Sequence, residues 1–386
     1  MKSVNKRRPA AGLVLAMLTS AVMATSVMAG GPTWKPPVNV RLTNGVELQD
    51  ADFSKRNVAI TWHEPGAGRK EVGIRTSVNA GSSFGPISWF PDSRQAAVDI
   101  CGGSELNAVM AHRIGPGNWF IEHAVGSIDG DGFVTTPVAP TDGKQRHPDV
   151  ACAGGRVFVS WFEEEGSGHR LFVAHARRTV GVFGTPIDLG FDDETFFFDG
   201  LAVAGVKDRA YAVFQRSDGD LRFKRWSIGS GPGFAVTPHA TQIIGNGTPN
   251  NPASYPVIAA AGDKVAVAWF RCGALWARVS NNRGRTWGPA RKLIEHAACD
   301  GDFIAVQRSI AIHDGRIVVA YMAAGIVGDG EVGLFSTRTD FASFSDNQIA
   351  SSFQLEHLVG FVTVSGDAKL AAAFNREDRV RFRRQQ

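Results

Sequence analysis

The sequence of 386 residues predicts an all-β fold, a β-propeller of seven four-stranded blades. Three observations support this prediction. A strand pattern recurs about every fifty residues, helical periodicity is absent, and tight turns containing Gly or Asp separate the strands. A period near fifty fits a four-stranded blade better than a two-helix repeat, which is shorter. Residues 30–386 are therefore expected to form one propeller domain.

The recurring element is a short apolar run that ends in an aromatic residue or its replacement. These ends are Trp62, Ala111, Trp161, Phe214, Trp269, Tyr321 and Phe374. The steps between them are 49, 50, 53, 55, 52 and 53 residues. Each unit alone buries too little apolar surface to be stable, so neighbouring units must stack. Because the second unit is degenerate, a six-bladed ring with a large insertion is the alternative.

Within a repeat we expect a first apolar strand, a tight turn, the aromatic-ended strand, a polar loop, a third strand, a Gly-containing turn and a fourth strand. The tight turns are A-G-G-R at 153–156, A-G-D-K at 261–264, H-D-G-R at 313–316 and S-G-D-A-K at 365–369. Gly and Asp suit these turns because they accept positive φ.

The last unit, about Leu355–Arg383, has sequence for three strands only. Residues 38–42, which precede the first complete repeat, are the candidate fourth strand. Pairing of the two chain ends would close the ring and remove both open edges. Arg379, Arg381 and Arg383 alternate with apolar residues, so we expect them on the solvated face of the last strand.

Residues 1–29 have the pattern of a cleaved secretory signal peptide. Basic residues open the segment, an apolar stretch follows over 10–28, and Val27-Met28-Ala29 is a small-residue exit. The competing interpretation is an uncleaved membrane anchor, which the polar residues at 19, 20, 25 and 26 disfavour. We therefore expect a periplasmic or secreted protein.

Cleavage would leave a chain without net charge. The signal holds four of the 41 basic residues and none of the 37 acidic ones, so 37 of each remain. A balanced chain gives no support for nucleic acid as a partner or for stable membrane insertion after cleavage. The sequence also predicts no cofactor and no metal site.

Four cysteines in an exported chain favour two disulfides, because the compartment is oxidising and no Cys-x-x-Cys spacing is present. Three pairings are possible. The repeat register favours Cys101 with Cys152, at the ends of the first strands of neighbouring blades. It also favours Cys272 with Cys299, on either side of the crossing from the fifth blade to the sixth. Free buried thiols are the alternative.

Two turns share a Ser-x-Asn-x-Gly pattern that ends in an aromatic residue. Their residues are Ser77, Asn79, Gly81 and Phe84 in the first, and Ser280, Asn282, Gly284 and Trp287 in the second. Weaker copies surround Ser127–Phe133, Phe183, Phe234 and Thr337–Phe344. Asn hydrogen-bonds the backbone nearby, Gly permits the turn, and the aromatic residue packs between sheets. The pattern resembles the Asp-box of sialidases and related propellers, with Asn in place of Asp.

The resemblance implies a sialidase-type active site on the rim opposite the boxes. Such a site has three arginines, a tyrosine nucleophile paired with a glutamate, and an aspartate. Arg216 and Arg271 match two of the arginines. Arg308 occupies the tyrosine position, and a guanidinium is no nucleophile, so Tyr255 or Tyr321 would have to supply the hydroxyl. The glutamate is missing, and only Asp199 is placed to substitute for it.

The rim expected opposite the boxes is rich in charged residues. It comprises His63, Glu64, His112, Arg113, His147, Asp149, Glu163, Glu164, Asp199, Arg216, Tyr255, Arg271, Arg308, Asn375, Arg376 and Glu377. The ligand-binding candidates are Arg216, Arg271, Arg308, Asp199 and Tyr255. We expect a sialidase-like propeller that binds glycan or protein here without the standard catalytic set. The alternatives are an exo-sialidase with rearranged residues and an envelope or extracellular scaffold whose rim charges pair with one another.

Overall fold

The computed structural model describes residues 36–384 except 42–45, 66–69, 130–131, 142, 179–180, 193–199, 232–234, 250, 296–302, 314, 326–329, 342–343, 351–359, 365–369 and 377–378. The expected signal peptide lies outside the described residues. All regular structure in the described part is β-strand. No helix found there is long and apolar enough to cross a membrane.

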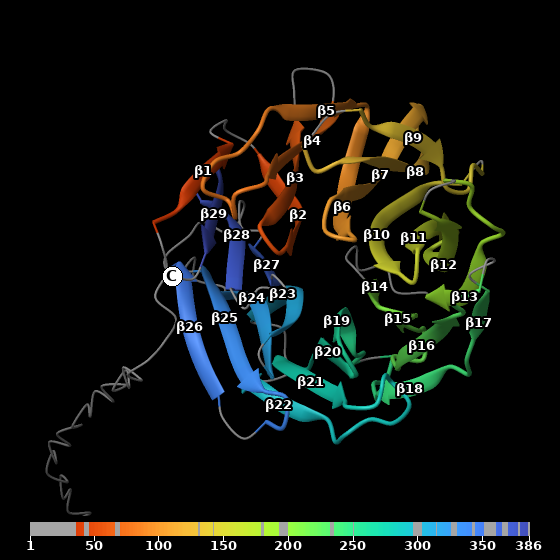
Figure 1. The fold of residues 1–386 in the computed structure, drawn as a ribbon. Helices are drawn as coiled ribbons and strands as arrows, with labels where there is room; N and C mark the ends of the chain where they lie inside the picture. The colour runs from red at the N-terminus through yellow and green to blue at the C-terminus, as the bar shows by residue number, and fades with distance from the viewer. Residues whose placement is uncertain are drawn as a thin grey trace, which may run out of the picture. The chain divides into compact units, whose positions relative to one another are not determined.

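The described strands form seven antiparallel sheets, numbered here in chain order (Figure 1). Sheet 1 holds β2 (Glu47–Ser54), β3 (Asn57–Pro65), β4 (Lys70–Ser77) and β5 (Ile87–Pro91). Sheet 2 holds β6 (Ser93–Cys101), β7 (Glu105–Gly115), β8 (Asn118–Ser127) and β9 (Val134–Pro137). Sheet 3 holds β10 (Gln145–Ala153), β11 (Arg156–Glu165), β12 (Gly168–Arg177) and β13 (Ile187–Asp192).

Sheet 4 holds β14 (Leu201–Val206), β15 (Arg209–Gln215), β16 (Leu221–Ile228), β17 (Val236–Pro238) and β18 (Gln242–Gly245), which also pairs with β16. Sheet 5 holds β19 (Ser254–Ala261), β20 (Lys264–Arg271), β21 (Ala274–Ser280) and β22 (Arg291–Glu295). Sheet 6 holds β23 (Phe303–His313), β24 (Arg316–Gly325), β25 (Gly330–Arg338) and β26 (Phe344–Ala350). Sheet 7 holds β27 (Gly360–Val364), β28 (Leu370–Arg376), β29 (Arg379–Arg384) and β1 (Val38–Arg41).

The aromatic-ended runs of the sequence are the second strands of these sheets. Trp62 lies in β3, Ala111 in β7, Trp161 in β11, Phe214 in β15, Trp269 in β20, Tyr321 in β24 and Phe374 in β28. Trp62 and Trp161 are at most 1% exposed, and Ala111 is fully buried. The fifty-residue step therefore corresponds to one sheet at a time, as the repeat predicts.

The N-terminal strand completes the last sheet. β1 pairs antiparallel with β29, with Val38 opposite Phe382. Val40 and Phe382 then share an apolar cluster with Leu48 and Trp62 of sheet 1. The first and last segments of the domain are thus held in one sheet and packed on the next, as the strand expected at 38–42 requires.

The first strands contact one another in sequence: β2 with β6, β6 with β10, β10 with β14, β14 with β19, β19 with β23, β23 with β27, and β27 with β2. Each sheet has a hairpin end, where its first strand turns into its second; in sheets 1 to 6 the third strand also turns into the fourth at this end. It also has a loop end, where the second strand passes to the third and the chain enters the first strand.

The first strands of sheets 1, 2, 3, 5 and 6 carry a bulge near the loop end. The register shifts between Leu48 and Asp50, Arg94 and Ala96, Arg146 and Asp149, Ser254 and Val257, and Gln307 and Ser309. Three of the bulged residues have positive φ: Gln95 at 51°, His147 at 50° and Tyr255 at 54°. Bulges redirect side chains, and positive φ in such residues is a strained conformation. The repeat therefore places a strained residue at one position in three sheets.

The two Ser-x-Asn-x-Gly turns have the same hydrogen bonds. In the first, the Ser77 hydroxyl oxygen accepts from the Gly81 N–H at 2.9 Å, and the Asn79 side-chain oxygen accepts from the Ser83 N–H at 2.9 Å. The second repeats this with Ser280, Asn282, Gly284 and Thr286 at the same two distances. Asn thus makes the backbone hydrogen bonds that the sequence pattern requires.

The aromatic residue of each of these turns packs on the third strand of the preceding sheet. Phe84 meets Phe382 edge-on at 5.7 Å, and Trp287 meets Phe223 edge-on at 4.8 Å. The weaker copy at Phe183 meets His123 in the same way at 5.3 Å. Phe234 lies outside the described residues. The turns therefore join neighbouring sheets at the hairpin end.

Candidate functional site

Arg216 follows β15 at the loop end of sheet 4, but its guanidinium is engaged. Its Nη1 donates to the Leu189 carbonyl of β13 at 2.8 Å. Gly190 beside it has φ +111°, and a Cβ there would overlap the guanidinium. The Arg216 guanidinium therefore occupies the space that a side chain at Gly190 of sheet 3 would take. Its role as a ligand contact stays a prediction.

The other predicted ligand residues lie at the loop ends of sheets 5 and 6. Arg271 is the last residue of β20, and Tyr255 is the bulged residue of β19. Arg308 is the bulged residue of β23, although its side chain is outside the described part. Asp199 lies outside the described residues. Tyr255 and Arg308 thus share one repeat position, which the sequence did not indicate.

Several charged rim residues of sheets 1, 2 and 7 form ion pairs. Arg41 holds Glu64 with two hydrogen bonds of 2.9 Å. Glu47 lies 3.5 Å from His63, and Glu122 lies 3.7 Å from His112. These contacts agree with the alternative in which rim charges pair with one another, and such pairs contribute little stability.

A different group at the loop ends of sheets 2 and 3 has more positive than negative charge. We call it the Arg94 group, and it comprises Arg94, Arg113, Trp119, Lys144, Arg146 and Glu164. The Arg94 guanidinium lies 3.8 Å from the centre of the Trp119 ring, and Trp119 is 7% exposed. Arg113 lies directly opposite Trp119 in the β7–β8 register. Three strands of sheet 2 therefore build one side of the group.

The negative charge in this group comes from Glu164. Its carboxylate pairs with Arg146 at 2.6 Å and with Lys144 at 3.1 Å. Arg94 pairs with no carboxylate in the described part of the chain, where its buried Nε and Nη2 also have no hydrogen-bond partner. Burial and the charge of Arg146 lower the pKa of Arg94, Glu164 acts in the opposite direction, and Arg113 lowers it again; the resulting pKa is about 10. A cation in this state is stabilised by any anion that reaches it.

The bulged residues of sheets 2 and 3 join beside this group. Gln95 Nε2 and His147 Nε2 lie 3.1 Å apart, and the backbone N–H of His147 donates to Gln95 Oε1 at 3.2 Å. This contact holds the start of β6 against the start of β10. Arg94 and Arg146 are the residues directly before these bulges, so the contact fixes their spacing.

The sequence contained a signal for this group. Arg94-Gln95 and Arg146-His147 precede Cys101 and Cys152 by nearly equal distances, in S-R-Q-A-A-V-D-I-C and Q-R-H-P-D-V-A-C. Aligning the repeats backward from the cysteines places the two arginines in register. The two intervals are seven and six residues, although the bulge in β10 spans two residues, which include Pro148, and the bulge in β6 spans one.

Aspartates on the first strands link neighbouring sheets. Each accepts a hydrogen bond from a backbone N–H of the next first strand: Asp50 from Val98 at 2.8 Å, Asp52 from Ile100 at 2.7 Å, Asp99 from Cys152 at 2.6 Å and Asp149 from Val203 at 2.8 Å. Bonds from N–H groups to carboxylates are strong. The chain thus joins sheets 1 to 4 through carboxyl groups.

Burial and, to a smaller extent, the charges of Asp149 and Asp52 raise the pKa of Asp50 to about 8. The native protein therefore binds a proton at Asp50 that the unfolded chain releases near pH 4. Stability should fall as pH rises from about 4 to about 8. We expect Asp50→Asn to reduce this fall by about 1–3 kcal/mol, measured by urea unfolding at pH 5 and pH 8.

The exposed Asp129 supplies the matched control, since its carboxyl bonds only the local Ser127 turn. Asp129→Asn should leave the pH dependence unchanged. An equal change in both variants would show that Asp50 is not its source.

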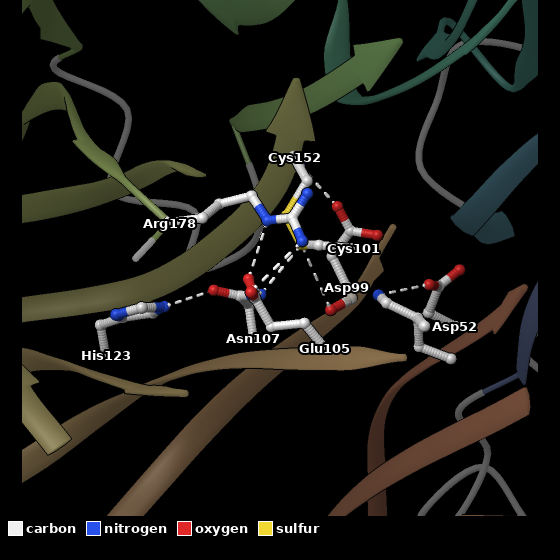
Figure 2. The surroundings of a disulfide bond; sticks show 9 residues. Asp52, Asp99, Cys101, Glu105, Asn107, His123, Cys152 and Arg178 are labelled. Carbon is white, nitrogen blue, oxygen red and sulfur yellow. Dashed lines mark hydrogen bonds and ion pairs between the residues drawn. A yellow bond between two sulfur atoms is a disulfide. The ribbon is translucent and has the colours of Figure 1, made fainter. Parts of the chain in front are cut away.

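A disulfide joins Cys101 of β6 to Cys152 of β10, with Cα atoms 5.8 Å apart, and this confirms the first predicted pair (Figure 2). Beside it, Arg178 binds Glu105 through two contacts of 2.8 and 3.2 Å. Cys272 is also disulfide-bonded, but Cys299 lies outside the described residues. Asp99 and the Cys101 and Cys152 sulfurs lie within 4.8 Å of one another. Sulfurs bonded to each other offer no thiolate to a metal ion.

No protein-family model matches the chain, and no curated protein matches its sequence. Among solved structures it is similar to an ulvan lyase, a polysaccharide lyase bound to glucuronic acid and sulfated rhamnose. The TM-score is 0.58 at 10% identity, over 90% of this chain and 95% of the lyase. It is also similar to the β-propeller domain of the trilobed protease of Pyrococcus furiosus, with TM-score 0.50 at 8% identity over 88% and 95%.

A sialidase of Trypanosoma rangeli is a further structural neighbour, with TM-score 0.44 at 13% identity, over 90% of this chain and 59% of the sialidase. The structural neighbours thus include both sialidases and polysaccharide lyases. At such low identity, similarity shows the fold alone, and it is the fold that the repeats predict: an all-β chain of four-stranded antiparallel sheets with the architecture of a β-propeller.

Proposed function

We propose that the protein is an exported, sialidase-like propeller of seven blades that binds acidic glycans through the Arg94 group, without the standard sialidase catalytic set. The observation that carries the proposal is that Arg94 is a cation without a carboxylate of its own among the described residues. Its Nε and Nη2 have no hydrogen-bond partner there, and the acidic residue that acts on it, Glu164, pairs with Arg146 and Lys144. Sugar carboxylates and sulfates are acceptors that guanidinium groups bind strongly.

Three observations support the other parts of this proposal. The seven sheets, their first strands in cyclic contact and the β1–β29 pair are what a seven-bladed ring requires. The Cys101–Cys152 disulfide fits an oxidising compartment, in agreement with a signal peptide at 1–29. The ulvan lyase that shares the fold holds an acidic saccharide. The Ser77 and Ser280 turns would be its Asp-boxes, placed away from the glycan.

The test is titration of the purified protein with glucuronate oligosaccharides by calorimetry. We expect Arg94→Gln to weaken binding about tenfold or more, because one charge-assisted contact contributes roughly 1.5–3 kcal/mol. Arg170→Gln is the matched control: Arg170 also lies near the loop end of sheet 3, but Glu165 and Asp188 already compensate its charge. Equal binding by the native protein and Arg94→Gln would refute the proposal.

A second candidate function is β-elimination on uronic acid glycans, as in a polysaccharide lyase. The observation in its favour is the place of His147 and Tyr255, which occupy strained bulge positions at the loop ends of sheets 3 and 5. Histidine and tyrosine side chains can serve as general base and general acid. Such a reaction forms an unsaturated uronate that absorbs ultraviolet light. Its appearance with native protein, and its loss in His147→Ala and Tyr255→Phe, would establish the lyase.

A further inference from the structure

A second cationic cluster lies at the hairpin end, where sheet 4 meets sheet 5. We call it the hairpin-end seam, and it comprises Arg209 and Tyr211 of β15, Arg225 and Ser227 of β16, His239, and Arg283 and Arg285 of the turn after β21. In the β15–β16 register, Arg225 lies directly opposite Tyr211, and Ser227 lies opposite Arg209. These four residues therefore share one face of sheet 4.

The turn after β21 closes the seam from sheet 5. Arg225 donates from Nη1 to the Arg283 carbonyl at 3.4 Å, and Gln242 donates to the Gly284 carbonyl at 3.1 Å. A Cβ on Gly284 would lie 2.5 Å from Phe223 Cζ and in van der Waals contact with Tyr211 Cε1, at 3.6 Å. The tyrosine ring therefore abuts the turn that carries Arg283 and Arg285.

Acidic residues compensate only part of this charge. Asp208 lies 2.5 Å from Arg209, and Asp263 lies 2.6 Å from Arg283. Among the described residues, no carboxylate pairs with Arg225 or Arg285. Burial lowers the pKa of Arg225, and the charges of Arg285 and Arg209 lower it further. The pKa of His239 is lowered by burial and by the same arginines.

Two donors at the seam are buried without a partner. Tyr211 is 1% exposed, and its hydroxyl has no hydrogen-bond partner among the described residues. The buried Arg225 Nε has none among them either. Burial raises the pKa of Tyr211 to about 12, and the charges of Arg209, Arg225 and Arg283 act in the opposite direction. An unmade bond of a buried donor costs roughly 1–3 kcal/mol. A ligand that accepts from both donors would recover that energy.

We propose that the hairpin-end seam is a second anion-binding site, which takes a sulfate or phosphate group between Arg225, Arg285 and the Tyr211 hydroxyl. A tetrahedral oxyanion offers several acceptor oxygens at once, as donors approaching from two sheets require. The site is at the opposite sheet end from the Arg94 group and does not depend on the function proposed for that group. Its occupant is either a free oxyanion or the sulfate ester of a glycan.

The test is calorimetric titration of the purified protein with sodium sulfate, at constant ionic strength. We expect saturable binding that Arg225→Gln and Arg285→Gln each weaken about tenfold or more, and that Tyr211→Phe weakens about fivefold. Lys224→Gln is the matched control: Lys224 pairs with Ala212 on the other face of β16, so its loss removes equal charge but should leave binding unchanged.

The inference would be overturned if the native protein showed no saturable binding, or if Arg225→Gln and Arg285→Gln bound sulfate as tightly as the native protein. Because Arg285 is exposed on a turn, Arg285→Gln should fold normally, and its unfolding midpoint without sulfate checks this. A second titration uses a sulfated disaccharide. Tighter binding than sulfate, lost in Arg285→Gln, identifies a glycan ester, whereas equal binding identifies the free ion. Arg94→Gln should bind sulfate at the seam normally, which separates this site from the loop-end proposal.

Discussion

Replacing Cys101 and Cys152 together with Ser should lower the free energy of unfolding by about 4 kcal/mol. The bond closes a loop between positions separated by 51 residues, and a cross-link of this length removes much of the entropy of the unfolded chain. It joins the first strands of sheets 2 and 3, so the whole of β7, β8 and β9 lies within the loop. Urea unfolding in non-reducing buffer measures the loss.

The double variant should still fold, because Asp99 continues to accept the hydrogen bond of the residue 152 N–H at 2.6 Å. Cys101→Ser alone is the control for the bond itself: it should expose one additional thiol to alkylation, measured by mass. A loss below about 1 kcal/mol in the double variant would contradict the expected effect of the cross-link.

Gly284→Ala should cost roughly 3 kcal/mol of stability. The residue has φ +72°, which an L side chain rarely adopts, and a Cβ would lie 2.5 Å from Phe223 Cζ of the preceding sheet. Strain in the backbone costs about 1 kcal/mol, and displacement of a packed ring adds about 1–3 kcal/mol. Urea unfolding of the variant measures the sum.

Gly262→Ala separates the two contributions. Gly262 has φ +60°, but nothing lies within 4 Å of the place that a Cβ would take. It should therefore lose only about 1 kcal/mol from backbone strain. An equal loss in the two variants would show that the turn does not hold sheets 4 and 5 together.

The strand repeats were predictable because each sheet is built from strands that are consecutive in the sequence. One apolar second strand and one tight turn therefore recur in every unit. Trp62, Trp161 and Trp269 each occupy the second strand that the spacing indicated. The pairing of 38–41 with β29 followed from the missing fourth strand of the last unit. The strands and their turns depend on residues that are close together in the chain, so the sequence predicts them well.

The charged sites were less predictable because they depend on contacts between sheets. Arg216 was a ligand candidate from its motif, yet a glycine on the preceding sheet gives its guanidinium a place against the Leu189 carbonyl. The sequence did not single out Arg94, because its environment forms only in the folded protein, where Trp119 packs on its guanidinium and the charge of Arg146 acts on it. Residues from other strands and from neighbouring sheets set these environments, and no local motif records them.

The most direct test incubates the purified protein with glucuronate oligosaccharides and a fluorogenic sialoside. Mass spectrometry detects cleavage of the oligosaccharides, and fluorescence detects hydrolysis of the sialoside. Binding of the oligosaccharides is measured in parallel by calorimetry. We expect the native protein to bind the glucuronate oligosaccharide and Arg94→Gln to lose this binding. We expect no release of the fluorophore. Release of the fluorophore that depends on Arg216 and Arg271 would contradict the proposed function, since the sialidase site would then be intact despite Arg308 in the nucleophile position.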